Sequence, residues 1–168
     1  MRVVLRRLAP ADLTAFQAYR HDEHVGLYQG WEPQSDVDAA QFIAHMSGVA
    51  LFAGGQWVQL GIADARTDAL LGDVGICVAE DGHTAEIGFT LSAAAQGVGL
   101  GTEAVRETIG LVFDHTRVAR IVAVTDERNL PAIRLLERVG MRRLETVAAV
   151  FRGQPCLEHV YAISREER

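Results

Sequence analysis

The stretch AAAQGVGLGTEA, residues 93–104, decides how this sequence is read, because three glycines alternate with apolar residues just where a helical pattern begins. Glycine weakens a helix interior by roughly 0.5–1 kcal/mol relative to alanine. Gly97, Gly99 and Gly101 therefore indicate that something must come close to the backbone. The first N–H groups of a helix lack intrahelical partners and lie at the positive end of its dipole, so a phosphate suits this position.

Two other phosphate-binding motifs fit the loop less well. A P-loop requires a lysine after the glycines, and none follows here. A dinucleotide-binding fingerprint requires GxGxxG, whereas this run is GxGxG with Thr102 where the third glycine should fall. Asp126, after the next predicted strand, keeps a nucleotide-binding oxidoreductase open as an alternative. A glycine turn that only packs a helix on a sheet is the remaining structural alternative.

Outward from the loop, hydrophobic periodicity and turn residues predict the other elements. A helix after Pro10 places Leu13, Phe16 and Ala18 inward, and a short helical piece covers 21–30. Further helices are expected at 36–46, 102–115 and 131–140. Strands are expected at 2–8, 56–63, 69–78, 83–91 and 121–124, and two final strands surround the turn at 152–155. The strand at 121–124 is expected to be buried on both faces. This order predicts one mixed α/β domain over residues 1–168, with a parallel strand pair joined by a right-handed crossover.

The composition narrows the function classes. The formal net charge of −6 argues against a nucleic-acid partner. No apolar run is long enough to span a membrane, and MRVVLRRLAPADL does not resemble a signal peptide, so a cytoplasmic protein is expected. Cys77 and Cys156 are expected to be buried free thiols, and the scattered histidines predict no metal site.

Three motifs together resemble the GCN5-related N-acetyltransferase (GNAT) superfamily. Gln96 to Gly101 is similar to its Q/R-x-x-G-x-G/A signature, which binds the pyrophosphate of acetyl-CoA. AEIGF at 85–89 resembles the family's fourth strand, and 129–141 resembles its N-x-x-[SA]-x-x-x-x-x-x-x-G-[FM] segment. The resemblance covers nearly the whole chain and is strongest to the RimJ/RimL-like branch, which acetylates protein N-termini, and its small-molecule relatives. It implies a mixed, mostly antiparallel sheet of about seven strands, with a central parallel pair splayed around acetyl-CoA and helices on both faces.

The resemblance also assigns cofactor-binding residues. The pyrophosphate would be held by the loop, with Thr102 also capping the helix, and the pantetheine arm by the strand edge and Asn129. The full set is Phe89, Thr90, Leu91, Ser92, Gln96, Gly97, Val98, Gly99, Leu100, Gly101, Thr102 and Asn129. Asn129 is equally a candidate helix cap.

Glu86 is the candidate catalytic residue. A primary alkylamine with a pKa near 10.4 must lose a proton before it attacks, and a carboxylate can accept that proton. The alternative is a glutamate that only orients substrate or pairs with a basic side chain. A backbone N–H near Phe89 or Thr90 would stabilise the oxyanion. Many family members carry a tyrosine general acid seven residues after the asparagine, but this chain has Leu136 there, so side-chain protonation of the thiolate is in doubt.

The acceptor is expected to be a primary amine, either a small molecule or a protein or peptide N-terminus. By resemblance Tyr28 and Trp31 would line its pocket, the alternative being a packed aromatic cluster. Asp73 either bonds nearby backbone or faces a cationic amine. Relatives in this branch are often dimers, which leaves a homodimer open. The rival class is a non-catalytic acyl-CoA-binding sensor, suggested by Leu136.

Overall fold

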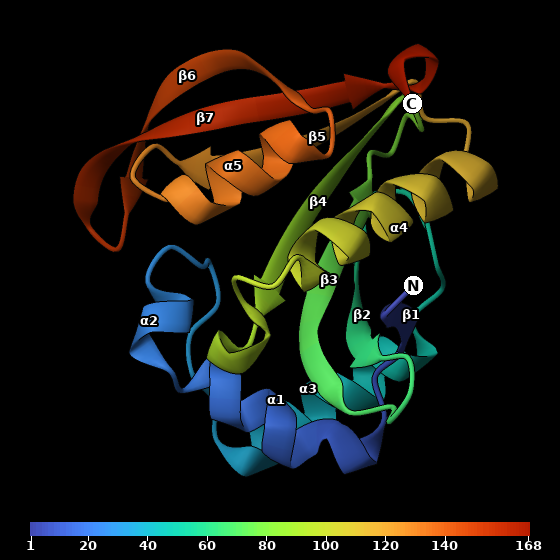
Figure 1. The fold of residues 1–168 in the computed structure, drawn as a ribbon, viewed down its shortest axis with the longest axis vertical. Coiled ribbons are helices and arrows are strands. Elements are labelled where there is room, and N and C mark those ends of the chain that lie inside the picture. Colours follow the sequence, from blue (N-terminus) through green and yellow to red (C-terminus); the bar gives the residue numbers. More distant parts are fainter.

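The computed structural model describes residues 1–168 around a seven-stranded sheet in the order β1-β2-β3-β4-β5-β7-β6 (Figure 1). The strands are β1 Val3–Arg7, β2 Trp57–Asp64, β3 Leu70–Val78, β4 Thr84–Leu91, β5 Arg120–Asp126, β6 Arg142–Phe151 and β7 Gln154–Ser164. The α-helices are α1 Leu13–Arg20, α2 Glu23–Gly26, α3 Asp36–Gly48, α4 Leu100–His115 and α5 Leu130–Arg138, and short 3-10 turns are η1 Pro10–Asp12, η2 Ala93–Ala95 and η3 Arg165–Glu167.

All neighbouring strands are antiparallel except β4 and β5, which are parallel. Their pairing runs only from Thr84 opposite Arg120 to Glu86 opposite Val122. Beyond that point the two strands diverge, as Figure 1 shows, and the rest of β4 has an open edge on this side. The predicted fold class, a mostly antiparallel sheet with one parallel pair, is confirmed.

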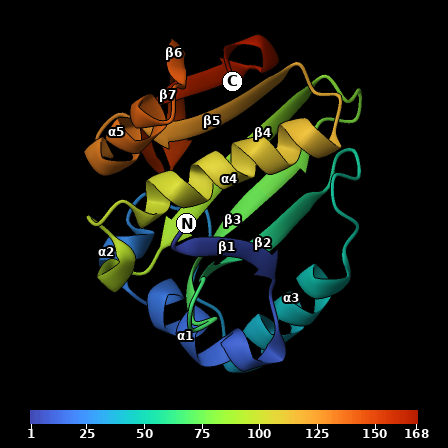
Figure 2. The same ribbon diagram turned by 45° about the vertical axis from the view of Figure 1, so that its right-hand side comes forward.

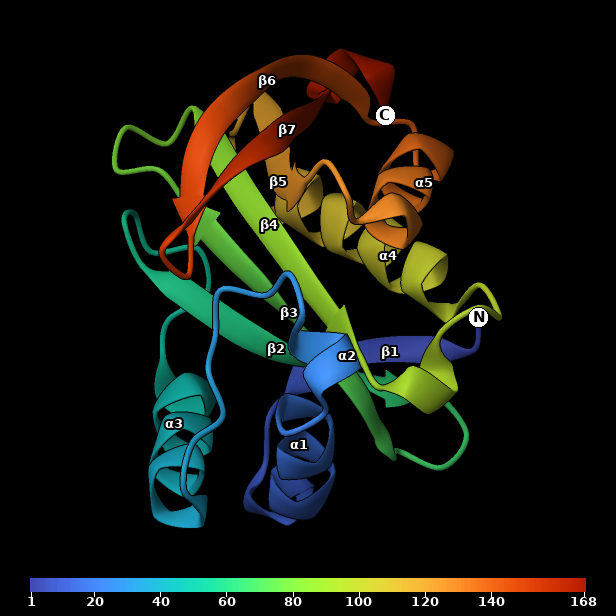
Figure 3. The same cartoon turned by 90° about the vertical axis from the view of Figure 1, so that its left-hand side faces the viewer.

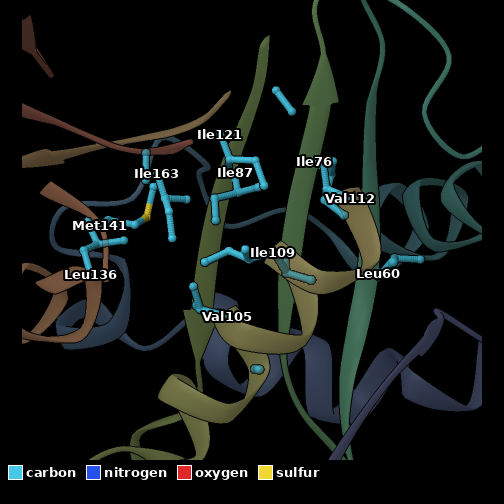
Figure 4. Close-up of a cluster of buried hydrophobic side chains, with 14 of the residues drawn as sticks. Leu60, Ile76, Ile87, Val105, Ile109, Val112, Ile121, Leu136, Met141 and Ile163 are labelled. Atoms are coloured by element: carbon cyan, nitrogen blue, oxygen red, sulfur yellow. The ribbon is translucent and has the colours of Figure 1, made fainter. Parts of the chain in front are cut away.

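The main hydrophobic core lies between the sheet and helices α4 and α5. Alternation along the strands sends every second side chain to this face, so Leu60, Ile76 and Ile87 meet Val105 and Ile109 of α4 (Figure 4). In α4 the buried residues recur at helical spacing, which is why the predicted amphipathic pattern was readable from sequence.

Helices α1 and α3 cover the opposite face (Figure 3). Phe16, Tyr19 and Ile43 belong to a second, smaller cluster there. Figure 2 shows the three-layer arrangement from another side, with α4 lying in front of the sheet. None of the helices combines the length and the apolar character that crossing a bilayer requires.

Several local predictions are wrong for identifiable reasons. The helical piece expected at 21–30 shrinks to α2, which Asp22 caps through the N–H groups of His24 and Val25. In α1, Ala18 is exposed while Tyr19 and Arg20 are buried. The expected burial of strand 121–124 on both faces fails at Val124, which is 40% exposed, because no helix covers that side of β5. The side chains of Cys77 and Cys156 are free but only partly buried.

Candidate active site

The glycine loop presents unpaired backbone donors in front of α4. Gly97 and Gly99 adopt left-handed conformations with φ of 77° and 86°, and Gly99 is the N-cap of the helix. Between Gln96, which donates to Ala93, and Glu103, which donates to Gly99, no backbone N–H donates to a carbonyl. A Cβ at Gly97 would have open space around it. This cradle of N–H groups at a positive helix end fits a diphosphate.

Neighbouring side chains hold the loop from outside. Arg2 Nη1 donates to the carbonyl of Val98 at 3.0 Å, and the Arg2 guanidinium pairs with Glu103. Gln96 Nε2 donates to the carbonyl of Leu91 at 3.0 Å. Thr102 does not cap the helix as expected, because Gly99 is the N-cap. Its buried hydroxyl instead accepts from Arg138 at 3.3 Å.

The open edge of β4 runs directly into this loop. Thr84 accepts from Ala79, and Ser92 donates to Leu71 on the β3 side, so the alternate residues Phe89 and Leu91 direct their backbone groups to the open edge. The two edge carbonyls accept from side chains, Phe89 from Gln29 at 3.2 Å and Leu91 from Gln96. Thr90 faces β3, and its hydroxyl accepts from Trp31 Nε1 at 3.1 Å. The geometry favours Phe89 over Thr90 as the free N–H donor.

Glu86 lies where β4 and β5 part, on the sheet face away from α4. Ala85 and Ile87 point into the α4 core, so Glu86 and Gly88 point to the other face. Burial, followed by the negative charge of Glu158, raises the pKa of the half-buried Glu86 carboxyl. Nothing lies within 4 Å of a Cβ built at Gly88, so the surface beside Glu86 is open.

The segment between α2 and α3 closes one side of this face. The Tyr28 ring stacks on the Arg128 guanidinium at 5.4 Å, and Arg128 pairs with Asp126 at the end of β5. Trp31 covers the Arg20 guanidinium at 4.5 Å. Tyr28 and Trp31 therefore lie beside the sheet face that carries Glu86, and both make the packing contacts of the alternative interpretation. Their part in an acceptor pocket stays a prediction.

Comparison with known proteins identifies this arrangement. A family profile described as "Acetyltransferase (GNAT) domain" matches residues 2–142. The chain belongs to the GNAT acetyltransferase family. The N-acetyltransferase p20 of Bacillus licheniformis is 27% identical over 168 residues, covering 99% of this chain and 94% of p20.

Solved structures share the GNAT fold over almost the full chain. A GNAT-family acetyltransferase from Bacillus anthracis superposes with a TM-score of 0.88 at 24% identity, covering 99% of this chain and 97% of that one. A spermidine N-acetyltransferase from Vibrio cholerae, in complex with CoA and spermine, gives a TM-score of 0.84 at 17% identity, again covering 99% and 97%.

Two residues of the GNAT motif after β5 have mainly structural contacts. Asn129 caps α5, because its side-chain oxygen accepts from the N–H of Ala132 at 3.4 Å. Leu136 is 1% exposed in the main core and offers no hydroxyl near the open edge. No group of three or more His, Cys, Asp or Glu side chains is arranged to hold a metal ion.

Sequence reasoning missed three residues at this GNAT site. Gln29 donates to the open edge of β4, and Arg152 donates to the carbonyl of Gln29 from a segment far away in the chain. Glu158 shares the Glu86 face because Tyr161 and Ile163, at odd positions of β7, fill the core. Only Arg152 had a local signal: arginine precedes Gly153 in a turn where asparagine is usual.

Proposed function

We propose that this protein is an acetyl-CoA-dependent N-acetyltransferase in which a primary amine attacks the thioester directly in a ternary complex. The observation that carries the proposal is the continuity of the unpaired loop N–H groups with the open edge of β4, beside Glu86. The acetyl-CoA thioester supplies the activated acyl group. The remaining tasks fall to side chains and amides of this chain.

The loop from Gln96 to Thr102 would bind the pyrophosphate, and the edge from Phe89 to Ser92 would bind the pantetheine arm, with Asn129 opposite. The N–H of Phe89 would donate to the oxyanion. Glu86 would accept the proton of the attacking amine, directly or through water. Its raised pKa lies nearer to neutrality than that of an ordinary glutamate, which improves a general base. Without a tyrosine at position 136, solvent would protonate the leaving thiolate.

The acceptor would lie on the Glu86 face, with Tyr28 and Trp31 on its flank. Both small amines and peptide N-termini stay within the proposal, the latter through the RimJ/RimL-like resemblance. The Vibrio cholerae relative, by its name, acts on spermidine, which supports including polyamines among the acceptors to be tested. We further propose a single cytoplasmic domain over 1–168, without nucleic-acid or membrane partners; a homodimer remains compatible.

Calorimetric titration with acetyl-CoA tests the first step, and absence of binding at millimolar ligand would end the proposal. Free-thiol release should then be measured with 1,4-diaminobutane, spermidine, kanamycin and a short peptide with a free N-terminus. The chain contains no lysine, so no side chain of the enzyme competes as an acceptor. Binding without release by a broad amine panel would favour the acyl-CoA sensor, the alternative suggested by Leu136.

The substitution Glu86→Gln tests the catalytic assignment. Removing a positioned general base typically lowers turnover by about 10²-fold or more. The affinity for acetyl-CoA should stay within about twofold, because the pyrophosphate loop is untouched. Glu107→Gln, on the exposed side of α4, is the matched control and should behave as wild type. Equal turnover in E86Q and E107Q would remove Glu86 from the mechanism.

A further inference from the structure

The tip of the β6–β7 hairpin contacts the segment that carries Tyr28 and Trp31. Arg152 Nη2 donates to the carbonyl of Gly26 at 2.9 Å and to that of Gln29 at 3.2 Å, across sequence separations of 126 and 123 residues. Figure 3 shows the hairpin bending toward the α2 segment. The proposed chemistry does not itself require this contact.

Arg152 occupies an unusual position for its residue type. Phe151 pairs with Gln154, so Arg152 and Gly153 form a two-residue turn. Their φ angles are 49° and 76°, both left-handed, as in a type I′ turn that favours Asn-Gly. The arginine side chain is supported by the Phe151 ring, 4.7 Å from the guanidinium. Arg152 is thus less favourable in this turn than asparagine would be, but its guanidinium reaches the α2 segment.

Gln29 is held at both ends. Arg152 binds its carbonyl, while its side-chain amide donates to the Phe89 carbonyl on the open edge of β4. Tyr28 stacks on Arg128 on the β5 side of the cleft, and Trp31 bonds to Thr90 of β4. Residues 26–31 are therefore fixed both to β4 and to the residues that follow β5, on the sheet face that carries Glu86.

We propose that Arg152 is a specificity-determining residue of the acceptor site. By fixing residues 26–31 it narrows the passage to Glu86 and restricts acceptors to primary amines on a slender, unbranched arm. The carboxylates of Glu86 and Glu158 interact electrostatically on this face of the sheet, and their negative charge favours a cationic arm. The inference rests on the proposed function for its substrate class, whereas the contact itself can be tested without activity.

Arg152→Asn removes the contact and keeps the turn, because asparagine tolerates the left-handed conformation well. Amide hydrogen exchange should accelerate roughly tenfold at Gly26 and Gln29, as expected for losing a charge-assisted hydrogen bond. These amides donate to Asp22 and Gly26 at 3.0 and 3.1 Å, and so report on the segment directly. Arg66→Asn, in the exposed turn between β2 and β3, is the matched control and should leave their exchange unchanged.

Kinetics supply the second measurement. In R152N the KM for 1,4-diaminobutane should rise roughly tenfold, the preference for diaminobutane over kanamycin should fall, and the Kd for acetyl-CoA should not change. Wild-type exchange at Gly26 and Gln29 in R152N, or an unchanged KM and preference, would overturn the inference. A wild-type protein that acetylates no amine overturns the proposed function, and the exchange comparison still decides whether Arg152 holds the segment.

Discussion

At the scale of single residues, the proposed general base is a carboxyl whose surroundings favour its protonated form. Glu86 is half-buried, and its pKa is raised first by burial and then by the charge of Glu158. A base works only when deprotonated, so the acidic limb of the pH–rate profile should lie above the ordinary glutamate pKa of about 4.3. In the proposed mechanism, the two carboxylates together would determine the pH range of activity.

The substitution Glu158→Gln tests this coupling. Removing the negative charge makes ionisation of Glu86 easier, so its pKa falls and the acidic limb of kcat/KM moves to lower pH. The measurement is a pH profile from about pH 4 to 9, with E107Q as the control for loss of a remote carboxylate. A limb that stays in place, or moves to higher pH, contradicts the proposed influence of Glu158 on Glu86.

Glu86 and Glu158 show which site residues can be predicted from sequence and which cannot. Glu86 could be named as a candidate because it lies within a local motif, AEIGF, just before the loop. Glu158 has no motif, and its place on the same face follows only from the pairing of β7 with β5. Asp73 was expected to bond nearby backbone or to face a cationic amine; instead, it bonds Tyr19, Arg20 and Gln59. Residues that come together only through strand pairing or tertiary packing leave no pattern in the local sequence.

At the scale of elements, the decisive unit is the turn from β4 into α4. Its strand and helix were predicted, because alternation and helical periodicity are local patterns. The glycines were interpreted as room for a ligand near the backbone, and the structure adds that Gly97 and Gly99 adopt left-handed φ. The helix begins at Leu100 instead of 102, since Gly99 takes the N-cap position. The helix expected at 21–30 was predicted too long. Tyr28 is positioned by Arg128, and Gln29 is positioned by Phe89 and Arg152. These contacts join segments far apart in the chain, so the local sequence does not reveal them.

Gly99→Ala tests whether this turn needs its glycines. At φ 86° an L residue is strained by roughly 1–2 kcal/mol, and the new Cβ would lie 3.2 Å from Arg2 Nη2. Relief of that strain would turn the loop N–H groups away from the diphosphate, so acetyl-CoA affinity should fall about tenfold or more. Calorimetric titration measures the loss of acetyl-CoA affinity, and thermal unfolding measures the strain.

The control is Gly48→Ala, because a Cβ at Gly48 has open space around it. Wild-type affinity for acetyl-CoA in G99A would contradict the proposed role of the loop.

At the scale of the whole molecule, the sheet separates two layers with different tasks. The α4–α5 layer contains the larger core and begins at the glycine loop, whereas the α1–α3 layer has the smaller core and includes the segment 26–31. A buried ion pair joins this second layer to the sheet. Arg20 of α1 donates to Asp73 of β3 at 2.9 Å, and its guanidinium lies against the rings of Phe16 and Trp31. The pair thus links α1 and the ring of Trp31 to the centre of the sheet.

Asp73→Asn tests this connection. The substitution leaves the Arg20 charge buried without its counter-charge, which typically costs about 3–5 kcal/mol in the free energy of unfolding. Urea unfolding followed by circular dichroism should show a lower midpoint with an unchanged slope. The double variant R20M/D73N removes both charges and keeps an apolar chain against Phe16 and Trp31, so it should be more stable than D73N alone. A loss below about 1 kcal/mol in D73N, or a further loss in the double variant, would show that the layer is held by apolar packing and not by the ion pair.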